Sequence, residues 1–151
     1  MATIDLRVGG TSALNYTDSL GRSFVLTKEV DFSDLADGDG AANADVIQLF
    51  NIPAGTLVQH VVAITKTAEG GAGTLTVGDA DDVDGYIASV NANSEGSYTS
   101  ALTLADGTPN TVVGYTAGKF YSADGVISAV AGAALDGAVI TFHVLCHNLN
   151  A

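Results

Sequence analysis

The sequence predicts an all-β protein, a β-sandwich of the jelly-roll or Greek-key-like kind. Three observations carry the prediction: Asp-Gly pairs recur along the chain, several segments alternate apolar and polar residues, and no segment shows convincing helical periodicity. Asp-Gly indicates hairpins because glycine accepts the positive backbone angles that tight turns need. Roughly eight to ten short strands separated by turns are typical of a sandwich. The Asp-Gly pairs are at residues 37–38, 39–40, 84–85, 106–107, 124–125 and 136–137.

The first half of the chain is expected to form an arm followed by four strands. Residues 1–21 contain only scattered apolar residues, which predicts an extended N-terminal arm or a loosely held strand. Residues 22–151 are expected to form a single β-sandwich domain, long enough to bury a sizeable core. Period-two alternation predicts the first strand at 22–32, where Lys28 interrupts the apolar face and is expected at its rim. An acidic, Gly-rich loop follows at 33–43, and then strands at 44–52, 56–66 and 74–77.

The second half of the chain continues the same pattern. Its predicted strands are 86–90, 97–104, 111–115, 119–121, 126–131 and 138–149. The last strand alternates regularly, so one of its faces is expected in the core. The expected core face is Ala138, Ile140, Phe142, Val144 and Cys146, and the opposite face holds Val139, Thr141, His143, Leu145 and His147.

Several predicted strands carry apolar residues on both faces. In the strand at 44–52, Val46, Phe50 and Ile52 share one side, whereas Ile47 and Leu49 share the other. In a helix-free sandwich the outer face of each sheet meets water, so surplus apolar surface needs a cover. We expect a neighbouring subunit to supply that cover. The Ala- and Gly-rich composition, which buries little area per side chain, favours the same interpretation.

The charge balance disfavours several classes of partner. The chain has 17 acidic and 5 basic residues, which gives a formal net charge of −12. Binding to nucleic acid or to an anionic membrane surface depends on Lys and Arg side chains, of which the chain has few. We therefore expect no nucleic-acid partner and no membrane partner. The first residues lack the cationic and apolar regions of a secretory signal, which predicts synthesis in a cytoplasm.

No combination of residues predicts catalysis, and the chain is expected not to be an enzyme. Cys146 is the single cysteine and is expected on the core face, where a thiol is inert. His143 and His147 share a strand face but lie about 13 Å apart along it, too far to bind one metal ion together. His60 is expected to be a half-buried strand residue. We predict no catalytic residue, no cofactor and no metal ligand.

Two local features have an alternative interpretation as binding sites. The loop Asp79–Gly85 contains four aspartates, and carboxylates are ligands that calcium prefers. Its spacing departs from a helical calcium loop because Val83 takes the fifth position. Turn chemistry, with Asp side chains bonded to nearby backbone amides, is therefore favoured. Phe120 and Tyr121 suit a sugar-stacking platform, although core or interface packing is the commoner role of such a pair.

Six short motifs, in order between residues 44 and 147, carry a resemblance to a known family. They are Asn51–Thr56, Thr67–Gly71, Thr76–Asp79, Asp82–Tyr86, Tyr115–Lys119 and Leu135–Val139. Together they resemble small virion structural proteins of tailed bacteriophages. The resemblance implies a capsid decoration (cement) protein, made in the bacterial host's cytoplasm, that sits as a homotrimer on the outer surface of the head. There it would bind the major capsid protein and stabilise the mature shell. A tail- or spike-associated module that binds a receptor or carbohydrate is the alternative.

Overall fold

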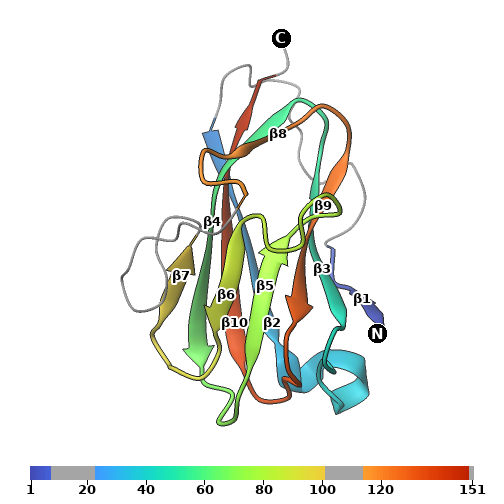
Figure 1. The fold of residues 1–151 in the computed structure, drawn as a ribbon, viewed down its shortest axis with the longest axis vertical. Coiled ribbons are helices and arrows are strands. Elements are labelled where there is room, and N and C mark those ends of the chain that lie inside the picture. The colour runs from blue at the N-terminus through green and yellow to red at the C-terminus, as the bar shows by residue number, and fades with distance from the viewer. Residues whose placement is uncertain (8–22, 101–113, 150–151) are drawn as a thin grey trace.

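The structure, a computed structural model, describes residues 1–7, 23–100 and 114–149, which form a sandwich of two β-sheets (Figure 1). One sheet has the strand order β1-β3-β9-β5-β6, and the other has the order β2-β10-β4-β7, with β8 also pairing with β4. The elements are β1 (Thr3–Asp5), β2 (Ser23–Asp31), the 3₁₀ helix η2 (Phe32–Gly38), β3 (Val46–Ile52), β4 (Thr56–Thr67), β5 (Thr74–Gly78), β6 (Ile87–Asn91), β7 (Tyr98–Ser100), β8 (Lys119–Tyr121), β9 (Gly125–Ala131) and β10 (Val139–Asn148).

The strand order is that of a jelly roll. Strands β2, β3, β4 and β5 pair antiparallel with β10, β9, β7 and β6 respectively. The chain therefore folds like a long hairpin whose successive strand pairs alternate between the two sheets, as two Greek keys do in a jelly roll. The predicted fold class is confirmed. Two short strands are added to this framework: β1, which lies parallel to β3, and β8.

Strand β10 is the centre of its sheet and follows the predicted alternation. It pairs along its length with β2 on one side and with β4 on the other. Its inward side chains are fully buried, whereas its outward row is largely half-buried. Because successive residues of a strand point to opposite faces, this strand supplies both the core and the outer surface of the sheet. The inward side chains are Ile140, Phe142, Val144 and Cys146.

A β-bulge removes part of the expected surplus of apolar surface. The pairing of β3 with β9 shifts register between Gln48 and Phe50, so one extra residue enters β3 at this point. The extra residue reverses the alternation, as bulges do. The prediction that the strand at 44–52 presents apolar residues on both faces is therefore wrong. Of the five apolar side chains that were predicted to lie on opposite faces, four are buried: Ile47, Leu49, Phe50 and Ile52.

Most of the described Asp-Gly pairs do not adopt the positive backbone angle that was predicted for them. Of the described pairs, only Asp39-Gly40 has a glycine with positive φ, at 72°. At Gly85 and Gly125 the constraint is space, because a Cβ on either glycine would overlap a tyrosine ring. The rings are those of Tyr115 and Tyr121, so these glycines allow close aromatic packing.

The segment predicted as an acidic loop at 33–43 is partly helical. Its first residues belong to the 3₁₀ helix η2, whose start is capped by Asp31, since Asp31 Oδ1 accepts a bond from Ser33 N at 3.0 Å. Phe32 and Leu35 are buried, and their spacing of three matches one turn of a 3₁₀ helix. The loop prediction missed this helix because two apolar residues three apart are too few to show helical periodicity.

Several other predicted segments lie partly outside the described residues. Residues 3–5 of the predicted arm form β1, with Val46 N donating to Ala2 O at 2.8 Å, while residues 8–22 lie outside the description. Strand β7 confirms the start of the strand predicted at 97–104. Most of the strand predicted at 111–115 lies outside the described residues, and its last two residues are in a turn.

Polar contacts close the rims of the sandwich. Lys28 Nζ donates to the carbonyl oxygen of Leu6 at 2.8 Å and so crosses from the second sheet to the first, which confirms its predicted place at the rim. Thr65 Oγ1 donates to the carbonyl oxygen of Asn91 at 2.8 Å on the other side. The carboxylate of Glu69 accepts three backbone N–H groups at 2.8–3.1 Å from the turn that precedes β10. No helix of the described ranges is long and apolar enough to cross a lipid bilayer.

Truncation of Phe142 tests the importance of β10 for the core. We expect Phe142→Ala to lower the free energy of unfolding by about 3–5 kcal/mol, because the cavity it leaves lies between two packed sheets. Val83→Ala is the control, since Val83 is 57% exposed and its truncation is expected to change stability by less than about 0.5 kcal/mol. Equal losses for the two variants in urea denaturation would contradict this assignment.

Candidate functional site

The densest polar cluster joins the acidic loop to strand β8. The carboxylate of Asp79, just after β5, accepts three side-chain hydrogen bonds. The donors are Lys119 Nζ at 2.6 Å, Tyr121 OH at 2.6 Å and Tyr115 OH at 3.0 Å. Because Asp79 follows a strand of the first sheet and β8 pairs with β4 of the second, the cluster ties the two sheets together.

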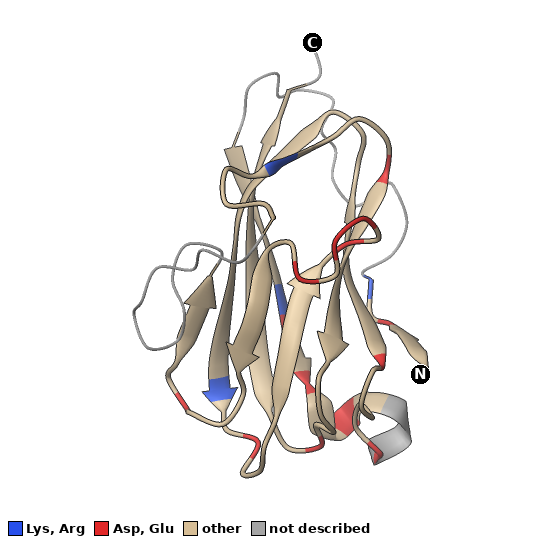
Figure 2. Cartoon of the chain, in the orientation of Figure 1, with Lys and Arg blue, Asp and Glu red and all other residues tan. Residues whose placement is uncertain are grey.

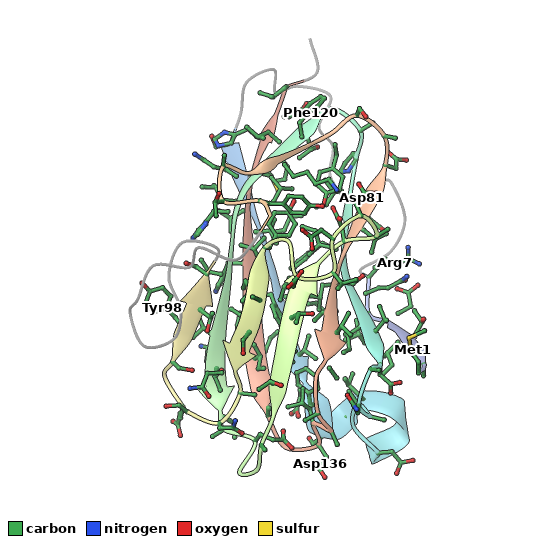
Figure 3. The ribbon with its side chains drawn as sticks, in the orientation of Figure 1. Met1, Arg7, Asp81, Tyr98, Phe120 and Asp136 are labelled. Atoms are coloured by element: carbon green, nitrogen blue, oxygen red, sulfur yellow. The ribbon has the colours of Figure 1, made fainter. Side chains whose placement is uncertain are left out.

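Burial makes the bond between Asp79 and Lys119 the central ion pair of this cluster. The side chain of Asp79 is 4% exposed and that of Lys119 is 17% exposed. Lys119 Nζ also lies 2.7 Å from Asp81, but that side chain is 81% exposed and its contribution is screened by water (Figure 3). The ammonium lies 4.6 Å from the ring centroid of Tyr115 and 5.2 Å from that of Tyr121, within range of cation–π attraction.

The electrostatics keep both members of the ion pair charged. Burial by itself raises the pKa of Asp79, but the hydrogen bonds from Lys119, Tyr121 and Tyr115 outweigh it and hold that pKa below its ordinary value. Burial likewise lowers the pKa of Lys119, and its bonds to the two aspartates raise the pKa above its ordinary value. A general acid or base needs a pKa near the working pH. This pair therefore suits a structural tie better than proton transfer.

Tyrosine packing completes the cluster. Tyr86 is fully buried, and its hydroxyl lies 3.1 Å from the hydroxyl of Tyr121. The rings of Tyr86 and Tyr115 meet edge to face with centroids 4.9 Å apart. Gly85 and Gly125 leave the space that the neighbouring tyrosine rings fill. The cluster could not be predicted from the sequence, because its members lie on separate segments that only the fold brings together.

The geometry favours the turn interpretation of the loop Asp79–Gly85. Asp79 Oδ1 accepts backbone N–H groups from Asp81 at 3.0 Å and Asp82 at 3.2 Å, which is the Asp-to-amide bonding expected of a turn. The burial of Asp79 was not expected. Within the described parts of the chain, no group of three His, Cys, Asp or Glu side chains is placed to hold a metal ion.

The three histidines of the chain share the outer face of the β2-β10-β4-β7 sheet. His143 and His147 point outward from β10, and His60 on β4 pairs with Leu145, which lies between them. Diagonal neighbours on one sheet face lie about 7–8 Å apart, so the three rings surround Leu145. His60 is half-buried as predicted, and burial lowers its pKa. The register of β4 against β10, which the sequence does not reveal, creates this grouping.

Hydrogen bonds orient two of these rings. His147 Nε2 lies 2.6 Å from Gln59 Oε1, and His147 Nδ1 lies 2.7 Å from Ser23 Oγ. The neutral tautomer with the proton on Nε2 satisfies both contacts, because Ser23 then donates to Nδ1. The row Ser23, His147 and Gln59 differs from a catalytic triad, whose third member is a carboxylate that stabilises the imidazolium. Thr27 Oγ1 lies 3.0 Å from His143 Nδ1 in the same way.

The aromatic pair on β8 is divided between two faces. Tyr121 is buried in the cluster around Asp79, whereas Phe120 is 51% exposed (Figure 3). Adjacent strand residues point in opposite directions, so the two rings do not form a shared sugar-stacking platform. Cys146 lies on the core face as predicted, and burial raises the pKa of its thiol to about 12, which keeps it unreactive.

Comparisons with known proteins show where this fold recurs. No protein-family model and no curated protein matches the chain. A chain in the acidic stable capsid structure of Helicobacter pylori bacteriophage KHP30 matches it with a TM-score of 0.57 and 14% identity, over 87% of this chain and 90% of that chain. A chain in the capsid of Ralstonia phage GP4 matches with a TM-score of 0.60 and 14% identity, over 89% of both chains. A chain in the cyanophage Pam1 capsid asymmetric unit matches with a TM-score of 0.58 and 15% identity, over 92% of this chain and 99% of that chain.

The shared feature is the sandwich itself. The TM-scores of 0.57–0.60 show a common fold over nearly the whole length of each chain, and at 14–15% identity the likeness is one of fold alone.

Neutralising one aspartate at a time separates the buried bond of Lys119 from the exposed one. We expect Asp79→Asn to lower the free energy of unfolding by about 3 kcal/mol, because it removes the buried carboxylate from a largely buried ammonium and leaves only the exposed one of Asp81. Asp81→Asn, the matched control, is expected to cost less than about 1 kcal/mol because its carboxylate is exposed. Chemical denaturation at neutral pH measures both. A larger loss of unfolding free energy for the Asp81 variant would contradict the assignment of Asp79 as the carboxylate that links the two sheets.

The same tie predicts a dependence of stability on pH. The folded chain holds the pKa of Asp79 below its ordinary value, so the ionised form favours folding. This contribution is present above the unfolded pKa of about 4 and is lost as the pH falls through the lower folded value. The stability difference between the wild type and Asp79→Asn should therefore shrink between pH 5 and pH 2. A difference that stays constant in denaturation curves over that range would refute this origin.

Proposed function

We propose that this chain is a structural protein of a bacteriophage virion and serves as a capsid decoration (cement) protein. It would bind the major capsid protein on the outer surface of the head and stabilise the mature shell as a homotrimer. The observation that supports this proposal is the fold likeness to chains of three phage capsids. That likeness covers 87–92% of this chain and 89–99% of each neighbour, so each neighbour consists almost wholly of the matching region.

The distribution of charge suits the outside of a shell. The chain has a formal net charge of −12, and the acidic residues gather in loops and at strand ends, including the loop between β5 and β6 (Figure 2). A surface of this kind is repelled by the phosphates of packaged DNA, whereas it keeps an outward-facing protein soluble. Binding only the mature shell would stabilise that state by mass action, without any catalytic step.

The tail- or spike-associated alternative gains no support from the described loops. A receptor-binding module of this fold would use the loops at 33–43 or 79–85 as its recognition surface. The first of these begins as a 3₁₀ helix with Phe32 and Leu35 in the core. The second is held to β8 through Asp79.

Reconstitution on shells tests the proposed function. We expect the purified chain to bind saturably to mature shells that lack it, and to raise the temperature at which those shells break open. Electron microscopy and a thermal melt measure the two effects, and immature shells serve as the control. Absence of binding to mature shells, or binding to isolated tails instead, would rule out the decoration role.

Two truncations of the same chain test the predicted arm. Deletion of residues 1–21 is expected to abolish shell binding while the sandwich remains folded. Deletion of residues 1–7 is the matched control, because it removes β1 with its bonds to β3 and the Lys28–Leu6 bond but keeps the rest of the arm. Loss of binding in the longer deletion alone assigns the contact to the rest of the arm, and loss in both assigns it to β1. Full occupancy in both would show that the arm does not grip the shell.

A further inference from the structure

The outer face of the second sheet has a region without carboxylates. We call this region the histidine face and define it by Val25, His60, Val62, His143, Leu145 and His147. Val25 is 58% exposed, and Val62 and Leu145 are half-buried. In the strand register these residues surround one another across β2, β10 and β4. Apolar side chains and imidazole rings therefore form a continuous surface here.

One charged group of the packed strands borders this face, and the others lie beyond it. On β2, the outward carboxylate of Glu29 pairs with Thr141, which is two residues from His143, whereas Asp31 pairs with Val139 at the opposite end of β10. Lys66 is at the same opposite end of β4. On β8, Lys119 is bonded to Asp79 and not to this face, and β7 carries no charged residue. Strand β10 itself has no Lys, Arg, Asp or Glu.

These observations favour a second copy of the chain as the occupant. Two molecules that each carry a charge of −12 repel one another wherever their carboxylates meet. The histidine face is the described part of the second sheet where this repulsion is least, and its apolar side chains gain from leaving water. With strands that rise about 3.3 Å per residue and lie about 4.8 Å apart, residues 143–147 of β10 and their neighbours on β2 and β4 present roughly 240 Å². The exposed rings of Phe120 and Tyr98 flank that area and extend it, so the histidine face is one part of a standard interface of ~800 Å² per partner.

We propose that the histidine face is a self-association surface, which packs against a second copy while its histidines are neutral and releases it when they are protonated. This inference rests on the proposed function for its partner, since self-association is part of that role. Protonation would place up to three positive charges on each face, and charge opposes burial. The bonds of His147 to Ser23 and Gln59 fix the position of its ring on this face.

Sedimentation of the isolated chain at two pH values tests the proposal. We expect association at pH 7.5 and binding at least ~10-fold weaker at pH 5.5, because protonated imidazoles would bury positive charge in the contact. Val25→Lys is expected to be monomeric at both pH values. Val83→Lys is the matched control, since Val83 is 57% exposed on the acidic loop, and it should associate like the wild type.

Replacement of His60, His143 and His147 together by Gln separates the pH response from the contact itself. This variant is expected to associate equally at pH 7.5 and pH 5.5. Circular dichroism at both pH values confirms that each variant is folded. A monomeric wild type at pH 7.5, an equal effect of Val83→Lys, or a retained pH response in the Gln variant would overturn the proposal. Shell binding by a monomeric wild type would overturn this inference alone, whereas an oligomer that ignores shells would overturn only the proposed function.

Discussion

The alternation of side chains on β10, held between β2 and β4, is the constraint on which the structure depends. Its inward residues fill the centre of the core and its outward residues include two of the three histidines. A slip of one residue in its pairing would exchange these two rows. The core, the position of the histidine face and the absence of charge on that face therefore follow from one register. Hydrogen bonding on both sides of the strand protects that register.

Polar side-chain contacts between the two sheets add to the apolar packing that holds them together. The two sheets of a sandwich share few backbone bonds, so their relative position depends on packing and on side chains that cross the rim. Lys28, Thr65 and the ion pair of Asp79 with Lys119 are such crossings. The Asp79 cluster uses acidic and aromatic residues that look like a binding site in the sequence. In the fold their polar groups are satisfied by one another, so an acidic loop serves stability.

Local patterns in the sequence predict much of the fold and little of the site. The alternation of β10 and the role of Lys28 were predictable because period two is a local property. The bulge in β3 was not, because the extra residue is defined only by its partner strand. The 3₁₀ helix was hidden in an acidic segment, although the spacing of Phe32 and Leu35 is a signal for it. The tyrosine cluster and the grouping of histidines depend on contacts between distant segments, which no local pattern encodes.

The proposed role places a self-contained jelly roll on a shell, with one uncharged sheet face against a neighbour and acidic loops toward solvent. Electron cryomicroscopy of a virion that contains this chain tests that arrangement most directly. The account predicts density for the sandwich on the outer surface of the head, with the β2-β10-β4 face covered by another copy. Density confined to the tail, or copies on the head whose histidine faces are all bare, would contradict it.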